Sequence, residues 1–350
     1  GIRLMAYSTI PKGSLYMNTK LYTGDGAASH AITGVGFQPD WVWLKNRSGA
    51  DNNSLNDVVR GANKNLVSNN ANSEATTTDQ LMSFNSDGFT VGASGSANTN
   101  GNNFVGWNWK AGTAVSGSTT GSGTAKTYTG SVNTTSGFSI IKYTGNGTAG
   151  HTIPHHLGAA PQMIIVKALS TNDDWMVGHT AAGFNQFMIL NSTARDATGT
   201  QFNSTVPTSS VFSIGSNNNM NQNDNSFVAY SFTNIKGFSK FGGYTGNGNA
   251  DGTFVYTGFK PAFVMVKLVS AAGEDWFICD NKREGYNAEN NRLLPNLNSA
   301  ESTDSPIDIV SNGFKARTSG ANVNAGEDYL YAAFAEEPLV ASNFNVATAR

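Results

Sequence analysis

The sequence has little charge, and no part of it is strongly basic or forms a long apolar segment. Charged residues make up 13% of the 350 residues, and the formal net charge is −2. Proteins that bind nucleic acid or an anionic membrane surface carry clusters of Lys and Arg, so both classes of partner are excluded. A membrane-spanning helix needs roughly 18 or more consecutive apolar residues, and no stretch approaches that length, so we expect no membrane insertion.

Cysteine and histidine are also scarce. The single cysteine, Cys279, has no partner for a disulfide within the chain and lies in an apolar run, so we predict a buried strand thiol rather than a nucleophile. Of the five histidines, His155 and His156 are adjacent and would point to opposite faces of a strand. They could not both bind one metal ion without a bend in the chain. We therefore predict no metal site and no cofactor.

Glycine and aromatic residues, in contrast, are abundant, with 39 Gly, 20 Phe, 11 Tyr and 6 Trp. Disordered chains have few aromatic residues and a high net charge, so this chain is expected to fold. A composition low in charge and rich in Gly, Ser, Thr and Asn favours a β-rich structure with many loops. The length fits two to three domains, each large enough to bury its own core.

One phrase, Tyr-Thr-Gly-(Asp/Asn)-Gly, occurs three times, at residues 22–26, 143–147 and 244–248. Each copy is followed by an apolar run that ends in a lysine, and the distance from the tyrosine to that lysine is 23, 24 and 23 residues. Constant spacing around variable loops is typical of a repeated fold, in which the register of the strands must hold. The glycines flank Asn or Asp, which indicates a tight turn rather than a phosphate-binding loop, because no helical pattern follows them.

Each copy predicts the same series of strands. An opening strand leads to the phrase, and the apolar run after it is a central strand covered on both faces, since its apolarity is continuous. A second strand begins with Asp-Trp in copies two and three, and residues 84–90 and 309–315 indicate hairpins around Asp-Gly and Asn-Gly. The closing strand alternates, so Val105, Trp107 and Trp109 lie on one face, towards a core.

These copies predict five segments. They are repeat one (1–112), a Gly/Ser/Thr-rich linker (113–125), repeat two (126–236), repeat three (237–337) and a C-terminal tail (338–350). The linker composition is typical of a flexible connection or a surface hairpin. No such spacer separates repeats two and three, so we expect these two to be held closely, and the first to have more freedom or at least to be joined differently. The tail is expected to pack as an arm or to contact a neighbouring subunit.

No catalytic constellation stands out, and the candidate ligand-binding residues are aromatic and amide side chains. Trp175 and Trp276 follow polar loops, and an indole face beside amides suits a pyranose ring; core burial is the competing interpretation of both. Asn-rich loops supply the other candidates, Asn102, Asn218 and Asn223, because loop tips often carry binding residues.

Glu74 and Glu301 occupy matching places in copies one and three and are the first candidates for a glycoside hydrolase. A retaining enzyme of that class needs two carboxylates roughly 5 Å apart in one cleft. One carboxylate per repeat is more simply a feature of a turn or strand edge, so we predict no enzymatic activity. A polysaccharide-degrading enzyme is kept as the alternative.

The motifs of copy three, taken in order, resemble a known repeat domain. They read Tyr-Thr-Gly-Asn-Gly, Val-Met-Val-Lys, Asp-Trp, Leu-Leu-Pro-Asn, Ser-Asn-Gly-Phe and Tyr-x-Ala-Phe-Ala-Glu. This series is similar to the repeat domain of virion structural proteins of tailed bacteriophages, particularly marine ones. The resemblance covers nearly the whole chain, although copy one lacks the Asp-Trp strand and copy two lacks the Leu-Pro-Asn and Asn-Gly-Phe elements.

The resemblance implies an all-β fold of three tandem jelly-roll sandwiches of the concanavalin A-like type. It implies a non-enzymatic structural protein of the virion surface, such as a tail fibre, spike or capsid-surface fibre. The implied partners are other virion proteins, further copies of the chain with a trimer favoured, and a host-surface glycan bound for attachment. A purely architectural particle protein without a ligand is the other alternative.

Overall fold

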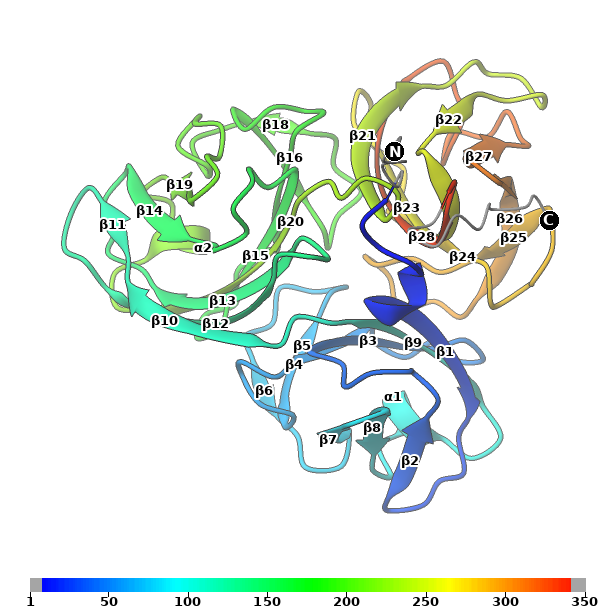
Figure 1. Ribbon diagram of the computed structural model, residues 1–350, viewed down its shortest axis with the longest axis horizontal. Helices are drawn as coiled ribbons and strands as arrows, with labels where there is room; N and C mark the ends of the chain where they lie inside the picture. Colours follow the sequence, from blue (N-terminus) through cyan, green and yellow to red (C-terminus); the bar gives the residue numbers. More distant parts are fainter. Residues whose placement is uncertain (1–7, 341–350) are drawn as a thin grey trace, which may run out of the picture.

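The protein is all-β in the computed structural model, which describes residues 8–340. Within these residues its strands form six sheets with antiparallel pairings, and the sheets come in pairs. In each pair, the sheet that contains the buried central strand, β3 (Trp41–Asn46), β15 (Met163–Ala168) or β23 (Phe259–Leu268), is called the large sheet, and the other is called the small sheet. The pairs define three lobes that lie around a common centre (Figure 1). Lobe 1 contains the strands of residues 17–109, lobe 2 those of residues 113–232 and lobe 3 those of residues 239–338.

Lobe 1 begins with a short 3-10 helix, η1 (Gly13–Leu15), and has a helical turn, α1 (Gly95–Asn98), before its last strand. Its strands are β1 (Met17–Thr23), β2 (His30–Thr33), β3 (Trp41–Asn46), β4 (Ser54–Asp57), β5 (Lys64–Val67), β6 (Ala75–Thr76), β7 (Leu81–Asn85), β8 (Gly88–Val91) and β9 (Asn103–Trp109). The large sheet has the order β1-β9-β3-β4-β5-β6, and the small sheet has the order β2-β8-β7.

Lobe 2 repeats this plan with extra strands at one edge, and it has a helical turn, α2 (Asn218–Asn221), at the corresponding place. Its strands are β10 (Thr113–Ser118), β11 (Thr120–Gly121), β12 (Thr127–Asn133), β13 (Phe138–Thr144), β14 (His151–Pro154), β15 (Met163–Ala168), β16 (Met176–His179), β17 (Gln186–Ile189), β18 (Ala197–Thr198), β19 (Val211–Ile214) and β20 (Ser226–Phe232). The large sheet has the order β10-β12-β13-β20-β15-β16-β17-β18, and the small sheet has the order β11-β14-β19.

Lobe 3 has two sheets of four strands. Its strands are β21 (Ser239–Thr245), β22 (Phe254–Tyr256), β23 (Phe259–Leu268), β24 (Phe277–Asp280), β25 (Glu289–Arg292), β26 (Ser302–Val310), β27 (Gly313–Ala316) and β28 (Asp328–Pro338). The large sheet has the order β21-β28-β23-β24, and the small sheet has the order β22-β27-β26-β25.

The three large sheets share four strands in the same order. These are β1-β9-β3-β4 in lobe 1, β13-β20-β15-β16 in lobe 2 and β21-β28-β23-β24 in lobe 3. Every residue of β3, β15 and β23 is buried, which confirms that the apolar runs are central strands covered on both faces. The predicted hairpins are confirmed as well, in β7–β8 and in β26–β27.

The repeated phrase forms the same corner in each lobe. The tyrosine hydroxyl donates to a backbone carbonyl just before the closing strand, at 2.6 Å for Tyr22 and at 2.7 Å for both Tyr143 and Tyr244. A Cβ on the first glycine would lie 2.2, 2.5 and 1.9 Å from a backbone oxygen of that segment, so no side chain fits there. The second glycine has a φ of 68°, 72° and 67°, which favours glycine. The predicted turn is therefore also a close contact between two chain segments.

A fully buried asparagine completes each corner, and the motifs of the sequence do not include it. The three residues are Asn98, Asn221 and Asn324. The side-chain oxygen of each asparagine accepts the backbone N–H of the residue that lies between the two glycines of the phrase. These residues are Asp25, Asn146 and Asn247, and the distances are 3.0, 2.8 and 3.1 Å. Each asparagine lies five or six residues before the aromatic residue that stacks on the corner tyrosine, and this recurrence is the signal that identifies it in the sequence.

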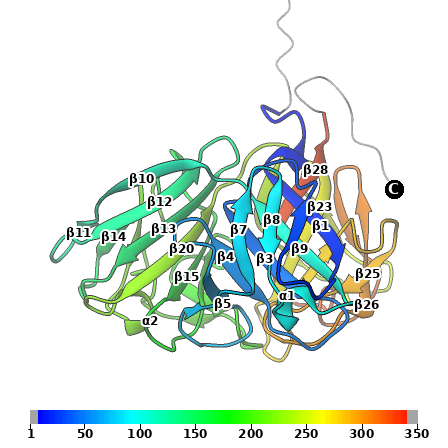
Figure 2. The ribbon, with the colours of Figure 1, turned by 90° about the horizontal axis from the view of Figure 1, so that it is seen from below.

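The predicted linker, residues 113–125, is built into lobe 2. It forms β10, which pairs with β12 at the edge of the large sheet, and β11, which pairs with β14 in the small sheet. Backbone groups at a sheet edge are free to pair with any extended segment, so Gly, Ser and Thr are sufficient here. Of the predicted tail, Pro338 ends β28, beside η1 on the same side of the ring (Figure 2), and residues 341–350 lie outside the described residues.

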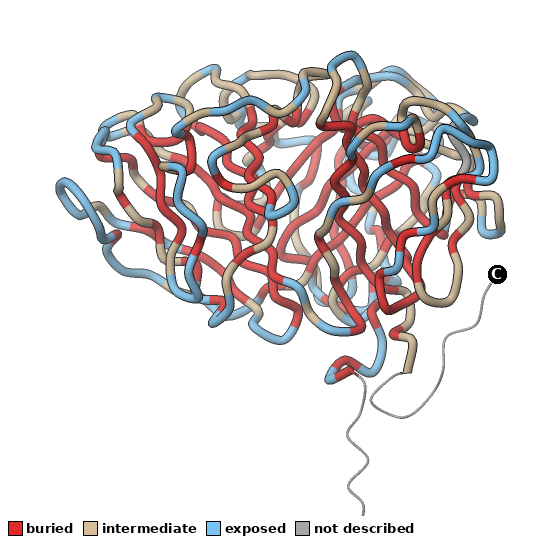
Figure 3. The backbone as a smooth tube through the Cα atoms, turned by 90° about the horizontal axis from the view of Figure 1, so that it is seen from above, coloured by how far each residue is buried: buried red, intermediate tan, exposed pale blue. Residues whose placement is uncertain are grey.

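The large sheets turn one face towards each other, and these faces form a shared core. Figure 3 shows the buried backbone in the interior of the molecule and exposed residues in the loops at its edges. At its centre Trp41 of lobe 1 stacks on Tyr230 of lobe 2 with ring centroids 4.5 Å apart, and Trp109 meets Phe263 of lobe 3 edge-on at 5.6 Å. The predicted inward face of the closing strand is confirmed, but the core that it faces is the shared one. The expected freedom of the first repeat is therefore wrong, because its indoles pack against both other lobes.

Candidate functional site

Buried lysines hold each lobe to another. The lysine at the last but one position of each central strand donates to a backbone carbonyl of another lobe. The contacts are Lys45 to Asn298 (2.8 Å), Lys167 to Ala71 (3.1 Å) and Lys267 to Thr193 (3.2 Å). Burial lowers the pKa of each lysine to about 8, so each remains an ammonium at neutral pH. Lobe 1 thus binds lobe 3, lobe 2 binds lobe 1 and lobe 3 binds lobe 2, which closes a ring.

The two tryptophans predicted as sugar platforms belong to the same junctions. Trp175 and Trp276 are both 0% exposed. The indole N–H of Trp175 donates to the carbonyl of Val67 in lobe 1, and that of Trp276 donates to the carbonyl of Ile189 in lobe 2, each at 2.9 Å. The prediction that sugars stack on these two tryptophans is therefore wrong, because neither ring face is open to a ligand. Core burial, the competing interpretation, is what the structure shows.

Lobe 1 has Asn53 at the position that corresponds to these tryptophans, next to the first residue of β4. The Asn53 amide donates to the carbonyls of Leu294 and Leu297 in lobe 3, at 3.1 and 2.8 Å. Copy one therefore lacks the Asp-Trp sequence but keeps the contact, since an amide and an indole both offer an N–H.

Arginines bind both glutamates that were the candidates for a hydrolase. Glu74 accepts a hydrogen bond from Arg60 at 3.2 Å. Glu301 accepts from Arg283 at 2.9 Å and from Arg47 of lobe 1 at 2.7 Å. The two glutamates lie in different lobes and each faces cations rather than a second acid. They do not form the carboxylate pair that a glycoside hydrolase needs.

The same arginines pair with fully buried aspartates. The pairs are Arg60 with Asp57 (2.5 Å) and Arg283 with Asp280 (2.7 Å). A side chain from a neighbouring lobe also donates to each aspartate, from Tyr230 to Asp57 at 2.7 Å and from Trp107 to Asp280 at 2.9 Å. Burial alone would raise the pKa of Asp280, but Arg283 and the hydrogen bonds hold that pKa below its usual value. Two junctions are therefore locked by buried charge.

At the junction of lobes 2 and 3, a histidine occupies the strand position that Asp57 and Asp280 have in the other lobes. His179 is fully buried, its Nε2 lies 3.2 Å from the carbonyl oxygen of Tyr331 in lobe 3, and its Nδ1 accepts the N–H of Ala181 at 3.1 Å. These partners assign the neutral tautomer with the proton on Nε2. Burial lowers the pKa of His179 to about 4.

Acid should therefore weaken the contact between lobes 2 and 3. Below the ordinary pKa of 6.5 the unfolded chain binds a proton at His179 and the folded protein does not. The stabilisation is thus complete above pH 6.5 and is lost as the pH falls towards 4. At pH 5 we expect this group to remove on the order of 2 kcal/mol from the free energy of unfolding. Urea unfolding at pH 7 and at pH 5 measures this loss of stability.

The His179→Gln variant is the control for this pH effect, because glutamine offers a donor and an acceptor but does not titrate. Its stability should fall less between pH 7 and pH 5 than that of the unmodified protein. Equal losses in the two proteins would show that other groups cause the acid sensitivity.

Three other histidines of lobe 2, His151, His155 and His156, do not converge on one point. His151 contacts Asn146, His155 contacts Thr208 and His156 contacts Tyr128. Within residues 8–340 no group of three or more His, Cys, Asp and Glu side chains is placed to hold a metal ion. The same part of the chain contains no helix that is long and apolar enough to cross a membrane. Cys279 is buried, as predicted, and burial raises the pKa of its thiol.

The three candidate asparagines lie on two lobes and form no common site. Asn102 is half-buried in lobe 1, where its backbone carbonyl accepts the N–H of Gly24 in the corner. Asn218 begins α2 of lobe 2, and Asn223 follows that helix and donates to Asp224 at 2.7 Å. Both are exposed, as expected for loop tips, but the structure gives them no ligand partner in common.

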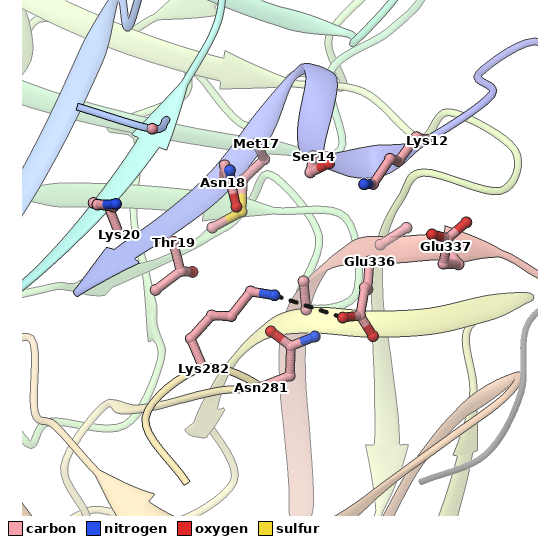
Figure 4. Close-up of a pocket in the computed structure, with 13 residues that line it drawn as sticks. Lys12, Ser14, Met17, Asn18, Thr19, Lys20, Asn281, Lys282, Glu336 and Glu337 are labelled. Carbon is pink, nitrogen blue, oxygen red and sulfur yellow. Dashed lines mark ion pairs between the residues drawn. The ribbon is translucent and has the colours of Figure 1, made fainter. Parts of the chain in front are cut away.

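A polar groove of about 350 Å³ lies at the junction of lobes 3 and 1 (Figure 4). β1 supplies Lys20, the segment after β24 supplies Lys282, and β28 supplies Glu336. Glu336 pairs with Lys282 at 3.7 Å and with Lys260 at 3.0 Å. The other labelled side chains are Lys12, Ser14, Met17, Asn18, Thr19, Asn281 and Glu337. The groove forms where segments from the two ends of the chain meet.

Ammonium, carboxylate, hydroxyl and amide groups line this groove, so its lining suits a polar ligand better than an apolar one. Pockets for drug-like compounds are of similar size, on the order of 300 to 1,000 Å³, but apolar side chains line most of their surface. Here the groups match a ligand rich in hydroxyls, and the lysines favour a negative charge on it. The motifs did not predict this groove, because its residues belong to segments far apart in the sequence, such as β1 and β28, which meet only through the closure of the ring.

Hollows at the other two junctions have different linings. The one between lobes 1 and 2 includes Asp40, Val59 and Ser131. The one between lobes 2 and 3 includes Asp196 and Tyr329. Among the described residues, no lysine lines either hollow. The lysine-lined groove is thus a feature of one junction rather than of the repeat.

The chain belongs to the family described as a domain of unknown function, DUF7483, whose model matches residues 12–338. The match runs from η1 to the end of β28 and so includes all three lobes. No curated protein and no solved structure matches the chain. The matched residues therefore span the whole ring rather than a single lobe.

Proposed function

We propose that this member of the DUF7483 family is a non-enzymatic structural protein on the surface of a tailed-bacteriophage virion, in a tail fibre, spike or capsid-surface fibre, and that it binds a host-surface glycan. The proposal includes a fold of three tandem sandwiches of the concanavalin A-like jelly-roll type. The common order of four strands in the large sheets and the motifs of the sequence support this fold. Other virion proteins and a trimer of chains are the proposed partners.

The closed ring is the observation that carries the proposal. Buried lysines and indoles link the lobes at each junction, and buried charged pairs add to two of the junctions, so we expect the ring to be rigid. A rigid body presents its binding groups without losing conformational entropy when a ligand arrives. Many of the residues exposed in its loops are Ser, Thr and Asn, whose hydroxyl and amide groups suit a hydroxylated ligand.

Glycan binding without glycan cleavage is the expected result for the isolated protein. Binding is measured on an array of bacterial surface oligosaccharides, and cleavage is measured as release of reducing sugar from the corresponding polysaccharide. In the groove of Figure 4, Lys20→Ala with Lys282→Ala should weaken the binding of oligosaccharides that contain uronic acids about tenfold at low salt, because two ammonium groups are lost.

The outcomes separate the alternatives. Release of reducing sugar would contradict the non-enzymatic proposal and favour a polysaccharide-degrading enzyme. An absence of both binding and release would favour a purely architectural particle protein. Binding without release supports the proposal as stated.

A further inference from the structure

Exposed aromatic side chains gather on one lobe. Among the described residues, three of the Phe, Tyr and Trp residues are well exposed. They are Phe254 (46%), Tyr256 (47%) and Tyr286 (67%). Phe254 and Tyr256 lie on β22, an edge strand of the small sheet of lobe 3, and Tyr286 precedes β25 at the opposite edge. Large apolar groups kept at the surface often mark a binding site.

The geometry of β22 places Phe254 and Tyr256 on the same outer face. Val255 between them is buried, so the two rings point away from the interior of the lobe. Side chains two positions apart on a strand are separated by roughly 7 Å. The neighbouring strand leaves room for the rings, since the Phe254 ring lies 3.1 Å from the place that a Cβ on Gly313 would take.

Charged groups surround this pair of rings. Lys240 donates to the backbone carbonyl of Tyr256 at 2.7 Å, and its ammonium lies 5.2 Å from the centre of the Tyr256 ring. Lys315, opposite Phe254 on β27, pairs with Asp251 at 2.5 Å, and the Asp251 side chain is 83% exposed. Flat apolar faces therefore lie beside carboxylate and ammonium groups that can bond to hydroxyls.

The other lobes carry no aromatic residues at these positions. Strand pairing aligns Phe254 and Tyr256 with Ala31 and Thr33 of lobe 1 and with Thr152 and Pro154 of lobe 2. In lobe 2, β11 also covers this edge, with Thr120 opposite Thr152. The fold therefore does not require aromatic side chains here, and a function specific to lobe 3 accounts for them.

We propose that Phe254 and Tyr256 form a stacking platform for the pyranose rings of a neutral glycan chain, with Asp251 and Lys315 bonding to its hydroxyls. This inference rests on the proposed glycan-binding function and names a second contact region, away from the groove of Figure 4. An aromatic face with polar groups at its edge is the arrangement that a sugar ring needs, because one face of the ring is apolar and its edge carries hydroxyls.

A second copy of the chain is a less suitable occupant. A stable dimer interface buries about 1,200 to 2,000 Å² in total, whereas two half-exposed aromatic side chains offer on the order of 200 Å². Charged side chains border the rings closely, and they would have to be desolvated against a protein partner. The small area and its charged border fit a sugar chain better than a protein surface.

The test compares the full chain with the Phe254→Ala/Tyr256→Thr variant, which introduces the residues that lobe 1 has at the matching positions. The probes are short neutral oligosaccharides of hexoses and N-acetylhexosamines, titrated by calorimetry. We expect the variant to lose about tenfold or more in affinity, because aromatic anchors dominate such contacts. Its melting temperature should stay close to that of the unmodified protein, since lobe 1 tolerates the same residues.

The Val206→Ala variant is the matched control, because it truncates an apolar side chain of lobe 2 that is 71% exposed and lies in neither proposed contact region, and it should bind the neutral probes within about twofold of the unmodified protein. Loss of affinity in the platform variant alone supports the inference. Unchanged affinity in the platform variant, or binding of the unmodified protein to acidic probes only, overturns the inference and leaves the proposed function standing. An unmodified protein that binds no glycan at all overturns both.

Discussion

Replacing Arg283 by Met is expected to destabilise the protein by about 3 to 5 kcal/mol, because Asp280 and Glu301 would lose the cation that neutralises them in a buried place. Arg283 is fully buried and contacts both acids, and Asp280 in turn accepts the indole N–H of Trp107 from lobe 1. The loss should therefore also loosen the junction between lobes 3 and 1. Thermal and urea unfolding measure the effect.

Two further variants show whether buried charge is the cause. Removing both partners, in Arg283→Met/Asp280→Asn, should be less costly than the single change, because the unpaired acid is gone and Arg47 still binds Glu301. Lys126→Met removes a surface pair with Asp224, whose side chain is 70% exposed, and should cost no more than about 1 kcal/mol. If Arg283→Met destabilised the protein as little as Lys126→Met does, the buried pair of Arg283 and Asp280 would not stabilise the fold as we expect.

Replacing Trp41 by Ala is also expected to lower the free energy of unfolding by about 3 to 5 kcal/mol, because buried apolar surface is lost and a cavity remains. The Trp41 side chain is 1% exposed at the centre of the ring. It stacks on Tyr230 of lobe 2 and contacts Trp109 of its own lobe, both with ring centroids 4.5 Å apart. The centre is otherwise close-packed, with a void of about 20 Å³, so the cavity cannot be filled by small shifts.

Calorimetry reports the effect on cooperativity as well as on stability. The unmodified protein should unfold in one transition, since all three lobes share one core, and Trp41→Ala should lower the midpoint and broaden or split that transition. Phe254→Ala, at a surface position, should change the midpoint by little. A midpoint for Trp41→Ala within the range of Phe254→Ala would mean that the lobes do not depend on the central stack.

The fold was predictable where local sequence dictates it. Continuous apolarity predicts buried central strands, and the Gly-containing phrase predicts a turn, because both depend on residues close in sequence. The linker was not predictable as β10 and β11, since strands at a sheet edge are held by backbone groups and need no apolar pattern. The closure of the ring was not predictable either, because Arg47 and Glu301 are 254 residues apart.

The candidate sites were predictable only in part. The Asp-Trp motif marks a position where an indole N–H crosses to another lobe, and nothing local distinguishes such a tryptophan from an exposed one. Phe254 and Tyr256, in contrast, differ from Ala31 and Thr33 at matching positions of lobe 1, so comparison of the copies reveals them. Differences between the copies point to ligand contacts, and their shared residues point to the lobe junctions.

The closure of lobe 1 on lobe 3 also sets an order in time. Lobe 1 is synthesised before lobe 3, yet the carbonyls that Lys45 and Asn53 require belong to residues 294–298, which the ribosome adds 241 to 253 residues later. Until then, the indole of Trp107 and the guanidinium of Arg47 have no Asp280 and no Glu301 to bind. The nascent chain therefore carries an open apolar face on lobe 1 until lobe 3 is made, and the ring closes only when lobe 3 arrives.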